Sequence, residues 1–96
     1  MSALIIIRIE VLNPSELKNY QDIAPGIIAK YKGKLVVRGG ELISLEGLEE
    51  KRRIVVLEFP SLEEAKTFYY SDEYEKAIKL RKDVANFEMI AIDCIN

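Results

Sequence analysis

The stretch "GKLVVRGGELISLEGLEEKRRIVVLEF", residues 33–59, decides the fold. Two short apolar runs, at 34–38 and 52–59, flank the charged segment "EGLEEK", and this pattern is typical of two strands joined by a turn. Arg38 lies inside the first apolar run, and Gly39 and Gly40 follow it directly. Paired glycines in a strand indicate a bulge or a close approach of two backbones. A cation at this place in a sheet needs either an acidic partner or a ligand.

A helix is predicted before this pair of strands. Asn13 can cap the helix, and Pro14 suits its first position. We expect Pro25-Gly26 to kink or break the helix, and Gly33 to end it in a left-handed conformation. Apolar residues recur between these points at helical spacing and form one stripe, which consists of Leu17, Tyr20, Ala24, Ile27, Ile28 and Tyr31.

A second helical region follows the pair of strands. Ser61 and Glu64 form a capping box at its start. Ser71 can cap a further segment, so we expect a break near Tyr70. Of the two tyrosines at this break, Tyr69 and Tyr70, one should point inward and the other outward.

Strands at the two ends of the chain complete the pattern. Residues 3–12 and 87–95 are apolar runs without turn residues. The element order is therefore β-α-β-β-α-β, which is the order of the ferredoxin-like fold. We predict a single α+β domain over residues 1–96, with an antiparallel four-stranded sheet in the strand order 4-1-3-2 and both helical regions on one face.

The composition narrows the functional classes. The 96 residues carry a net charge of −2 without a basic run, so we expect no nucleic-acid partner. The chain has no histidine and one cysteine, Cys94, so we predict no metal site and no cofactor. The N-terminal run "MSALIIIRIEVL" is too short to span a membrane and unlike a signal peptide. We therefore expect a soluble, cytoplasmic protein.

The sheet face away from the helices is expected to be apolar as well. Side chains alternate across each strand, and the set that we assign to this open face is Leu4, Ile6, Val36, Ile54, Val56, Met89 and Ala91. No third helical region exists to cover such a patch. We therefore predict a homodimer in which a second copy of the chain covers the open sheet face.

Each strand also contributes one charged residue to the predicted open face. In strand order these are Asp93, Arg8, Glu58 and Arg38, with alternating signs. If the turn lies near Leu48, Arg38 is opposite Glu58. Two interpretations follow: a ladder of ion pairs that sets the register of the dimer, or the polar floor of a ligand pocket. In the second, Arg38 holds a carboxylate or enolate oxygen, and Glu58 orients Arg38 or acts as a base.

Several blocks of the sequence together resemble the domain-of-unknown-function family 1330. These blocks are "YKGKLVVRGG", "LEG", "VVLEFPS", "AKTFYYSDEY" and the later Arg81, and they cover the chain from about Tyr20 to Asp93. Asp72 departs from the family pattern, which often has proline after Ser71. The resemblance implies a dimeric α+β barrel but no established activity. The wider superfamily includes cofactor-free monooxygenases, lactone isomerases and haem-dependent members, and the absence of histidine argues against histidine-ligated haem.

The resemblance and the sheet-face argument yield one list of candidate substrate-binding residues. We expect Ser71 to act as a helix cap rather than a nucleophile, and Tyr74 to pack on the stem of Arg81 with its hydroxyl at the surface. The sequence therefore leaves open a homodimer that binds a small anionic molecule, a cofactor-free monooxygenase or isomerase, and a structural dimer without a ligand. The candidate substrate-binding residues are Arg38, Glu58, Arg8, Tyr69, Ser71, Tyr74 and Arg81.

Overall fold

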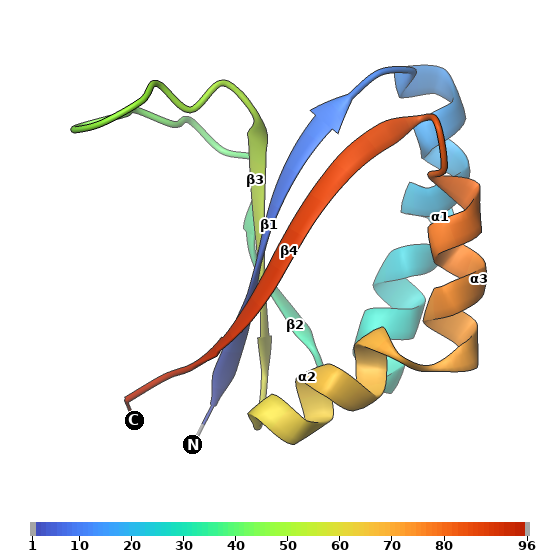
Figure 1. The fold of residues 1–96 in the computed structure, drawn as a ribbon. Helices are drawn as coiled ribbons and strands as arrows, with labels where there is room; N and C mark the ends of the chain where they lie inside the picture. The colour runs from blue at the N-terminus through green and yellow to red at the C-terminus, as the bar shows by residue number, and fades with distance from the viewer. Residues whose placement is uncertain (1, 96) are drawn as a thin grey trace.

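The computed structural model describes residues 2–95 and has the predicted element order. The strands are β1 (Ala3–Val11), β2 (Lys34–Arg38), β3 (Arg53–Phe59) and β4 (Ala85–Asp93). The helices are α1 (Pro14–Lys30), α2 (Leu62–Tyr69) and α3 (Asp72–Leu80). The strands form one antiparallel sheet in the order β2-β3-β1-β4, and the three helices cover one face of it (Figure 1). The predicted ferredoxin-like α+β fold is confirmed.

Side-chain caps begin each helix as predicted. The backbone amides of Glu16 and Glu64 each donate a hydrogen bond of 3.1 Å to the cap residues Asn13 and Ser61. Ser71 accepts from the amide of Tyr74 in the same way, and this cap separates α3 from α2 at the predicted break. These bonds satisfy amides that a helix start would otherwise leave unpaired.

We expected Pro25-Gly26 to kink or break the first helix, and the break does not occur, because α1 continues to Lys30. Proline removes a hydrogen bond to the residue four positions earlier, here Gln21. Gln21 and Pro25 are both exposed, so water can reach the freed carbonyl group. The apolar stripe packs on the sheet both before and after Pro25, which holds the helix together.

The end of α1 also differs from the prediction. Lys32, not Gly33, adopts the left-handed conformation, with φ of 70°. Gly33 is needed for space instead, because its amide donates to the carbonyl of Ile28 at 2.8 Å while its α-carbon lies against the ring of Phe59. A Cβ atom there would lie 2.7 Å from both Ile28 Cγ2 and Phe59 Cε2.

The core lies between the sheet and the helices. β1 and β3 contribute Ile5, Ile7, Ile9, Leu57 and Phe59, which pack against the buried faces of the helices. The predicted faces of β4 are wrong: Ile90 and Ile92 pair with Ile6 and Leu4 on the open face, whereas Met89 packs against the core. Both alternating sets of β4 are apolar, so alternation alone could not assign them.

A β-bulge in β2 changes the direction of Arg38. Leu35 pairs with Leu57 and Val37 pairs with Val56, so Val36 is the extra residue without a partner in β3. Arg38 therefore pairs with Val55, whose side chain faces the helices, and not with Glu58. Glu58 pairs with Lys34 on the open face. The predicted Arg38–Glu58 pair is wrong for two reasons. The register differs from the one expected for a turn near Leu48, so that Lys34 lies opposite Glu58, and the inserted residue moves Arg38 to the other face.

We expect Gly33→Ala to lower the free energy of unfolding by about 1–3 kcal/mol, because the added methyl group forces Ile28 and Phe59 apart. Gly26→Ala is the matched control. No atom lies within 4 Å of the Cβ position at Gly26, and alanine in a helix interior is more favourable than glycine by about 0.5–1 kcal/mol. Urea denaturation of both variants tests this, and equal destabilisation would contradict it.

Candidate functional site

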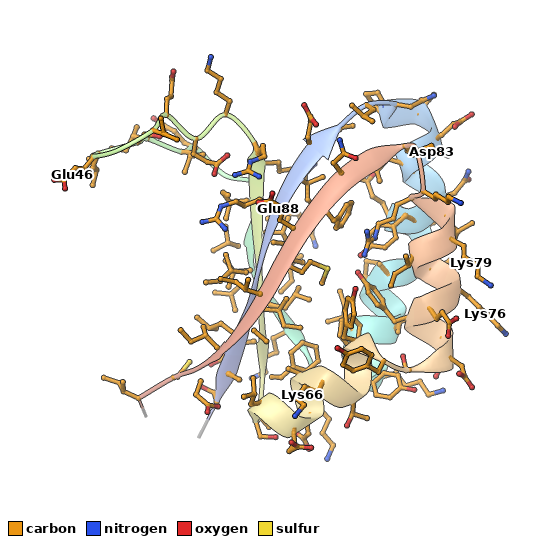
Figure 2. All side chains as sticks on the ribbon, viewed as in Figure 1. Glu46, Lys66, Lys76, Lys79, Asp83 and Glu88 are labelled. Atoms are coloured by element: carbon orange, nitrogen blue, oxygen red, sulfur yellow. The ribbon has the colours of Figure 1, made fainter. Side chains whose placement is uncertain are left out.

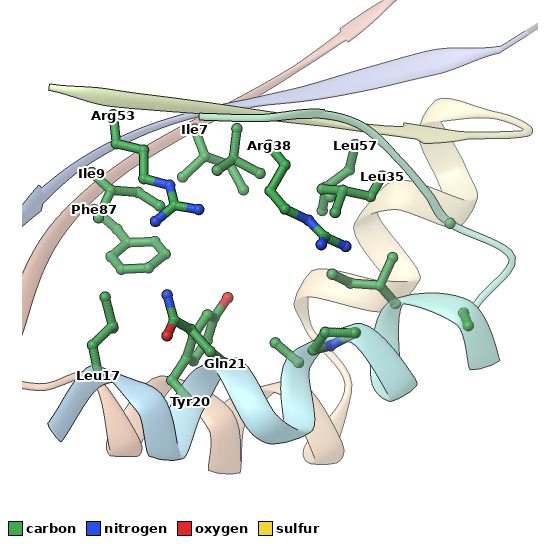
Figure 3. Close-up of a pocket in the computed structure, with 16 residues that line it drawn as sticks. Ile7, Ile9, Leu17, Tyr20, Gln21, Leu35, Arg38, Arg53, Leu57 and Phe87 are labelled. Carbon is green, nitrogen blue, oxygen red and sulfur yellow. The ribbon is translucent and has the colours of Figure 1, made fainter. Parts of the chain in front are cut away.

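A cavity of about 490 Å³ lies between the sheet and α1 (Figure 3). Its size falls in the range of about 300–1,000 Å³ that is usual for small-molecule sites. Most of its wall is apolar and comes from β1, β3, α1 and Phe87 of β4. The cavity lies on the helix-covered side of the sheet. The sequence predicted the pocket on the other side, on the open face.

Two arginines of the sheet contribute the charge of the cavity. The bulge turns Arg38 toward the helices, and Arg53 is the first residue of the neighbouring strand. Figure 3 shows both guanidinium groups directed from the sheet into the cavity. Within residues 2–95 neither side chain makes a hydrogen bond or an ion pair, and no acidic residue lines the cavity. Their donors are therefore available to a ligand.

Gly39 allows these two arginines to lie side by side. Its backbone has φ of 58°, and its amide donates to the carbonyl of Ile54 at 2.8 Å. A Cβ atom at Gly39 would lie 2.4 Å from Arg53 Nε. Only glycine combines the left-handed conformation with this close approach, as the paired glycines in the sequence indicated.

The opposite wall of the cavity is the first half of α1. Gln21 and Tyr20 point from this helix toward the sheet and face the two arginines (Figure 3). Tyr20 is buried as the apolar stripe predicted. The stripe indicated a core residue, however, and gave no sign that Tyr20 also lines a cavity.

Tyr20 also belongs to a buried polar cluster, which it forms with Tyr74 and Arg81. The hydroxyls of the two tyrosines share a hydrogen bond of 2.6 Å, and Arg81 Nη2 donates to the Tyr74 hydroxyl at 3.5 Å. The expected surface position of the Tyr74 hydroxyl is wrong, because Tyr74 is fully buried. Burial raises the pKa of the Tyr20 phenol well above its ordinary value, Tyr74 raises it further, and Arg81 offsets part of this effect. Tyr20 is therefore a hydrogen-bond donor at neutral pH and not a base.

The open face carries a different charge network from the one predicted. Glu50 accepts hydrogen bonds from Arg8 Nε at 3.1 Å and from Arg52 Nε at 2.8 Å, and Arg52 Nη1 lies 2.6 Å from a carboxylate oxygen of Glu88. Arg8 is thus part of an ion-pair network, but the predicted ladder with Asp93, Glu58 and Arg38 does not form. Hydrogen bonds from Arg52, with a smaller effect of Arg8, lower the pKa of Glu50 to about 2.

The remaining candidates lie outside the cavity. Ser71 uses both functions of its hydroxyl locally, since it accepts from Tyr74 N and donates to the carbonyl of Phe68 at 2.7 Å. Tyr69 packs inward against Tyr74 with ring centroids 5.7 Å apart, whereas Tyr70 is exposed, as expected for a pair at a helix break. Of the seven candidates only Arg38 lines the cavity.

Sequence reasoning missed Arg53, Gln21 and the second role of Tyr20. The sequence could have indicated Arg53, because it stands two residues before Val55, and side chains two residues apart on a strand share a face.

Among residues 2–95, no cluster of three or more histidine, cysteine, aspartate or glutamate side chains could hold a metal ion. The helices of this same region are too short or too polar to cross a membrane.

Comparison with known proteins supports the family and the fold. The family described as Domain of unknown function (DUF1330) matches residues 2–95. No curated protein matches the chain. A protein of unknown function from Rhodopseudomonas palustris is similar in structure, with a TM-score of 0.74 and 16% identity over 99% of this chain and 83% of that one.

Two further solved structures share the fold. SnoaB from Streptomyces nogalater, described as a cofactor-independent oxygenase, has a TM-score of 0.70 at 9% identity and covers 99% of this chain and 94% of its own. A dimeric protein of unknown function with a ferredoxin-like fold from Bacteroides fragilis has a TM-score of 0.63 at 13% identity, over 97% and 96% of the two chains. At these identities the similarity concerns the fold alone.

The ion-pair network predicts a specific dependence of stability on pH. The pKa of Glu50 is lower in the folded protein than its ordinary value of 4.5, so its stabilisation is present above about pH 4.5 and is lost as the pH falls toward about 2. We expect Glu50→Gln to lower the melting temperature at pH 7 and to weaken the decline in this acidic range. Glu46→Gln, at the tip of the exposed loop between β2 and β3 (Figure 2), is the control. Parallel curves for wild type and Glu50→Gln would contradict the prediction.

Proposed function

The chain belongs to the family described as Domain of unknown function 1330, and we propose that it is a homodimeric protein that binds a small anionic molecule with an apolar body in the cavity between the sheet and α1. The observation that carries the proposal is the pair Arg38 and Arg53 in a mostly apolar cavity without an acidic residue. Guanidinium groups bind carboxylate and enolate oxygens through two parallel donors.

The composition of the wall limits the ligand class. Ile7, Ile9, Leu17, Leu57 and Phe87 favour a ring or a short hydrocarbon chain, because burial of apolar surface stabilises the complex by about 25 cal/mol per Å². The arginines favour a negative charge at the sheet end of that ligand. An aromatic or branched carboxylate, or the enolate of a conjugated ketone, meets both requirements.

A second candidate function is a cofactor-free oxygenase or isomerase that acts on such an anion. It is supported by the same cavity in a fold that the chain shares with SnoaB. Two cations beside an apolar chamber favour the ionised form of a substrate, and that is the form from which either reaction would begin. Oxygen consumption with a bound ligand separates the oxygenase from simple binding, and conversion of the ligand to an isomer without oxygen uptake identifies the isomerase. The cytoplasmic location expected from the sequence stays a prediction.

The homodimer is proposed from the uncovered sheet face. Ile90 and Ile92 are each 53% exposed on this face, beside Leu4, Ile6, Ile54 and Val56. An apolar surface of this kind marks an interface. The dimeric ferredoxin-like protein from Bacteroides fragilis supports a second copy as the partner.

The loop between β2 and β3 extends this surface. It projects from the sheet on the side away from the helices (Figure 1). Its leucines are strongly exposed, with 88% for Leu45 and 96% for Leu48. Exposed leucines on a projecting loop are costly in an isolated chain, so we propose that the loop packs on the partner subunit.

The binding proposal predicts that cinnamate binds and that its neutral amide, cinnamamide, binds at least about tenfold more weakly, because only the carboxylate engages the arginines. Titration of the isotope-labelled protein, followed by nuclear magnetic resonance, should shift residues that line the cavity. Octanoate serves as an aliphatic carboxylate with the same charge. If none of these anions perturbs the cavity residues, the binding proposal fails.

Arg53→Gln and Arg38→Gln should each weaken cinnamate binding by about tenfold or more, since each removes charged donors from the cavity. Arg52→Gln is the matched control, because Arg52 is adjacent in sequence but pairs with Glu50 and Glu88 on the opposite face. An equal loss of affinity in all three variants would indicate a general charge effect and would argue against a built site.

The dimer proposal predicts that Ile90→Glu produces a monomer, because two copies of the new charge would be buried in the interface. Ile23→Glu places the same charge on α1 at a partly exposed residue and should leave the dimer intact. Size-exclusion chromatography with light scattering gives the mass of each. A monomeric wild-type protein would overturn the proposed interface.

A further inference from the structure

Arg81 is a buried cation without a counter-ion. Its exposed fraction is only 9%, it pairs with no carboxylate among residues 2–95, and its Nε has no hydrogen-bond partner there. Aromatic rings surround it instead, with the Arg81 Cζ atom 3.9 Å from the ring centre of Phe87 and 5.6 Å from that of Tyr20. Contacts with aromatic rings offset only part of the cost of burying a charge. Arg81 therefore leaves uncompensated positive potential in this part of the core.

Phe87 and Tyr20 are also two of the residues that line the cavity. The positive potential of Arg81 therefore lies directly behind the cavity wall, where the low dielectric transmits it further than water would. Arg38 and Arg53 contribute positive charge from the sheet. The cavity is thus bordered by cations at two places, namely the two arginines on the sheet and Arg81 behind the rings of Phe87 and Tyr20.

The donor chemistry of Arg81 favours one direction for the hydrogen bonds in the cluster. Arginine only donates, so Tyr74 accepts from Arg81 at 3.5 Å and retains a proton to give. That proton has two acceptors in reach, the Tyr20 oxygen at 2.6 Å and the Met89 sulfur at 3.8 Å. Sulfur is the weaker acceptor. When Tyr74 donates to Tyr20, the proton of Tyr20 is free to donate in turn.

Tyr20 is placed to make that donation to a ligand. Its hydroxyl points from α1 into the cavity, toward the sheet (Figure 3). Burial raises the pKa of the Tyr20 hydroxyl, so this group stays protonated at neutral pH. An anionic oxygen in the cavity would favour the direction of hydrogen bonds from Arg81 through Tyr74 to Tyr20.

We propose that Tyr20 is the second ligand-binding donor of the cavity, with Tyr74 and Arg81 as positioning residues that strengthen it. This inference rests on the proposed function. It narrows the ligand class to molecules with two oxygen functions on an apolar frame. One is an acid that binds Arg38 and Arg53, and the other is a phenol, enol or ketone oxygen that meets Tyr20. The site would stabilise the ionised form of that second oxygen.

The test uses cinnamate and para-hydroxycinnamate, two probes that differ only in the phenol group. Tyr20→Phe removes a single oxygen atom that cinnamate has no group to meet, so it should weaken cinnamate binding much less than para-hydroxycinnamate binding. For para-hydroxycinnamate we expect a loss of about tenfold to a hundredfold, the range of a hydrogen bond to a charged group. Its phenolate absorbs at longer wavelength than the phenol, so absorbance titration also gives the pKa of the bound probe. That pKa should be lower than in free solution and should rise in Tyr20→Phe.

Two further variants test the positioning residues and the specificity of the effect. Arg81→Met should raise the pKa of the bound probe while the melting temperature stays equal or increases, because it removes an unpaired buried charge. Tyr31→Phe is the matched control, since Tyr31 caps the C-terminal end of α1 and its hydroxyl donates to Glu73 outside the cavity. This variant should change neither the affinity for either probe nor the pKa of bound para-hydroxycinnamate.

The possible results separate the two proposals. If both probes bind the wild type and Tyr20→Phe affects neither of them, or both equally, the role of Tyr20 is overturned and the proposed function stands. If neither probe binds the wild type, the proposed function is overturned together with this inference. A selective loss of para-hydroxycinnamate in Tyr20→Phe, with an unchanged pKa of the bound probe in Arg81→Met, would retain Tyr20 as a donor and overturn the role of Arg81.

Discussion

The bulge at Val36 is the local constraint on which the cavity depends. Without it, the register that pairs Leu35 with Leu57 would continue along β2 and place Arg38 opposite Ile54, on the open face. One additional residue in β2 turns Arg38 to the helix side, opposite Val55. The left-handed Gly39 then lets the chain pass over Arg53. A single backbone irregularity thus brings two cations to one wall and keeps them away from acidic partners.

The distribution of arginines argues that the unpaired ones are not incidental. Arg8 and Arg52 lie on the open face and pair with Glu50 or Glu88. Arg38, Arg53 and Arg81 lie in or behind the cavity and have no acidic partner within residues 2–95. The chain contains more acidic than basic residues, 16 against 14, so acidic partners were not in short supply. The contrast between the two faces is what we would expect if a negative ligand binds in the cavity, as proposed.

The fold was predictable because its signals are local. The caps Asn13, Ser61 and Ser71 and the apolar runs mark each element within a few residues, and the element order then gives the topology. It was harder to predict which face of the sheet each side chain occupies. Both alternating sets of β4 are apolar, and nothing in the sequence distinguishes the bulge residue Val36 from a regular strand residue. Prediction therefore selected Arg38, which lines the cavity, but gave it the wrong partner and the wrong side of the sheet. Tyr20 could not be found at all, because a core tyrosine and a cavity tyrosine have the same position in an apolar stripe.

The two faces of the sheet have separate proposed roles, but both are formed by the same single layer of strands. On β3, Arg53, Val55 and Leu57 face the cavity, while Ile54 and Val56 face the open side. The backbone that fixes Arg53 therefore also holds the residues that we propose to be covered by a second copy. Burial of the open face would restrict the motion of β3 and β2, and hence the separation of the two guanidinium groups. A ligand that binds both arginines gains affinity when that separation is fixed in advance, so covering the open face would also favour binding on the opposite side of the sheet.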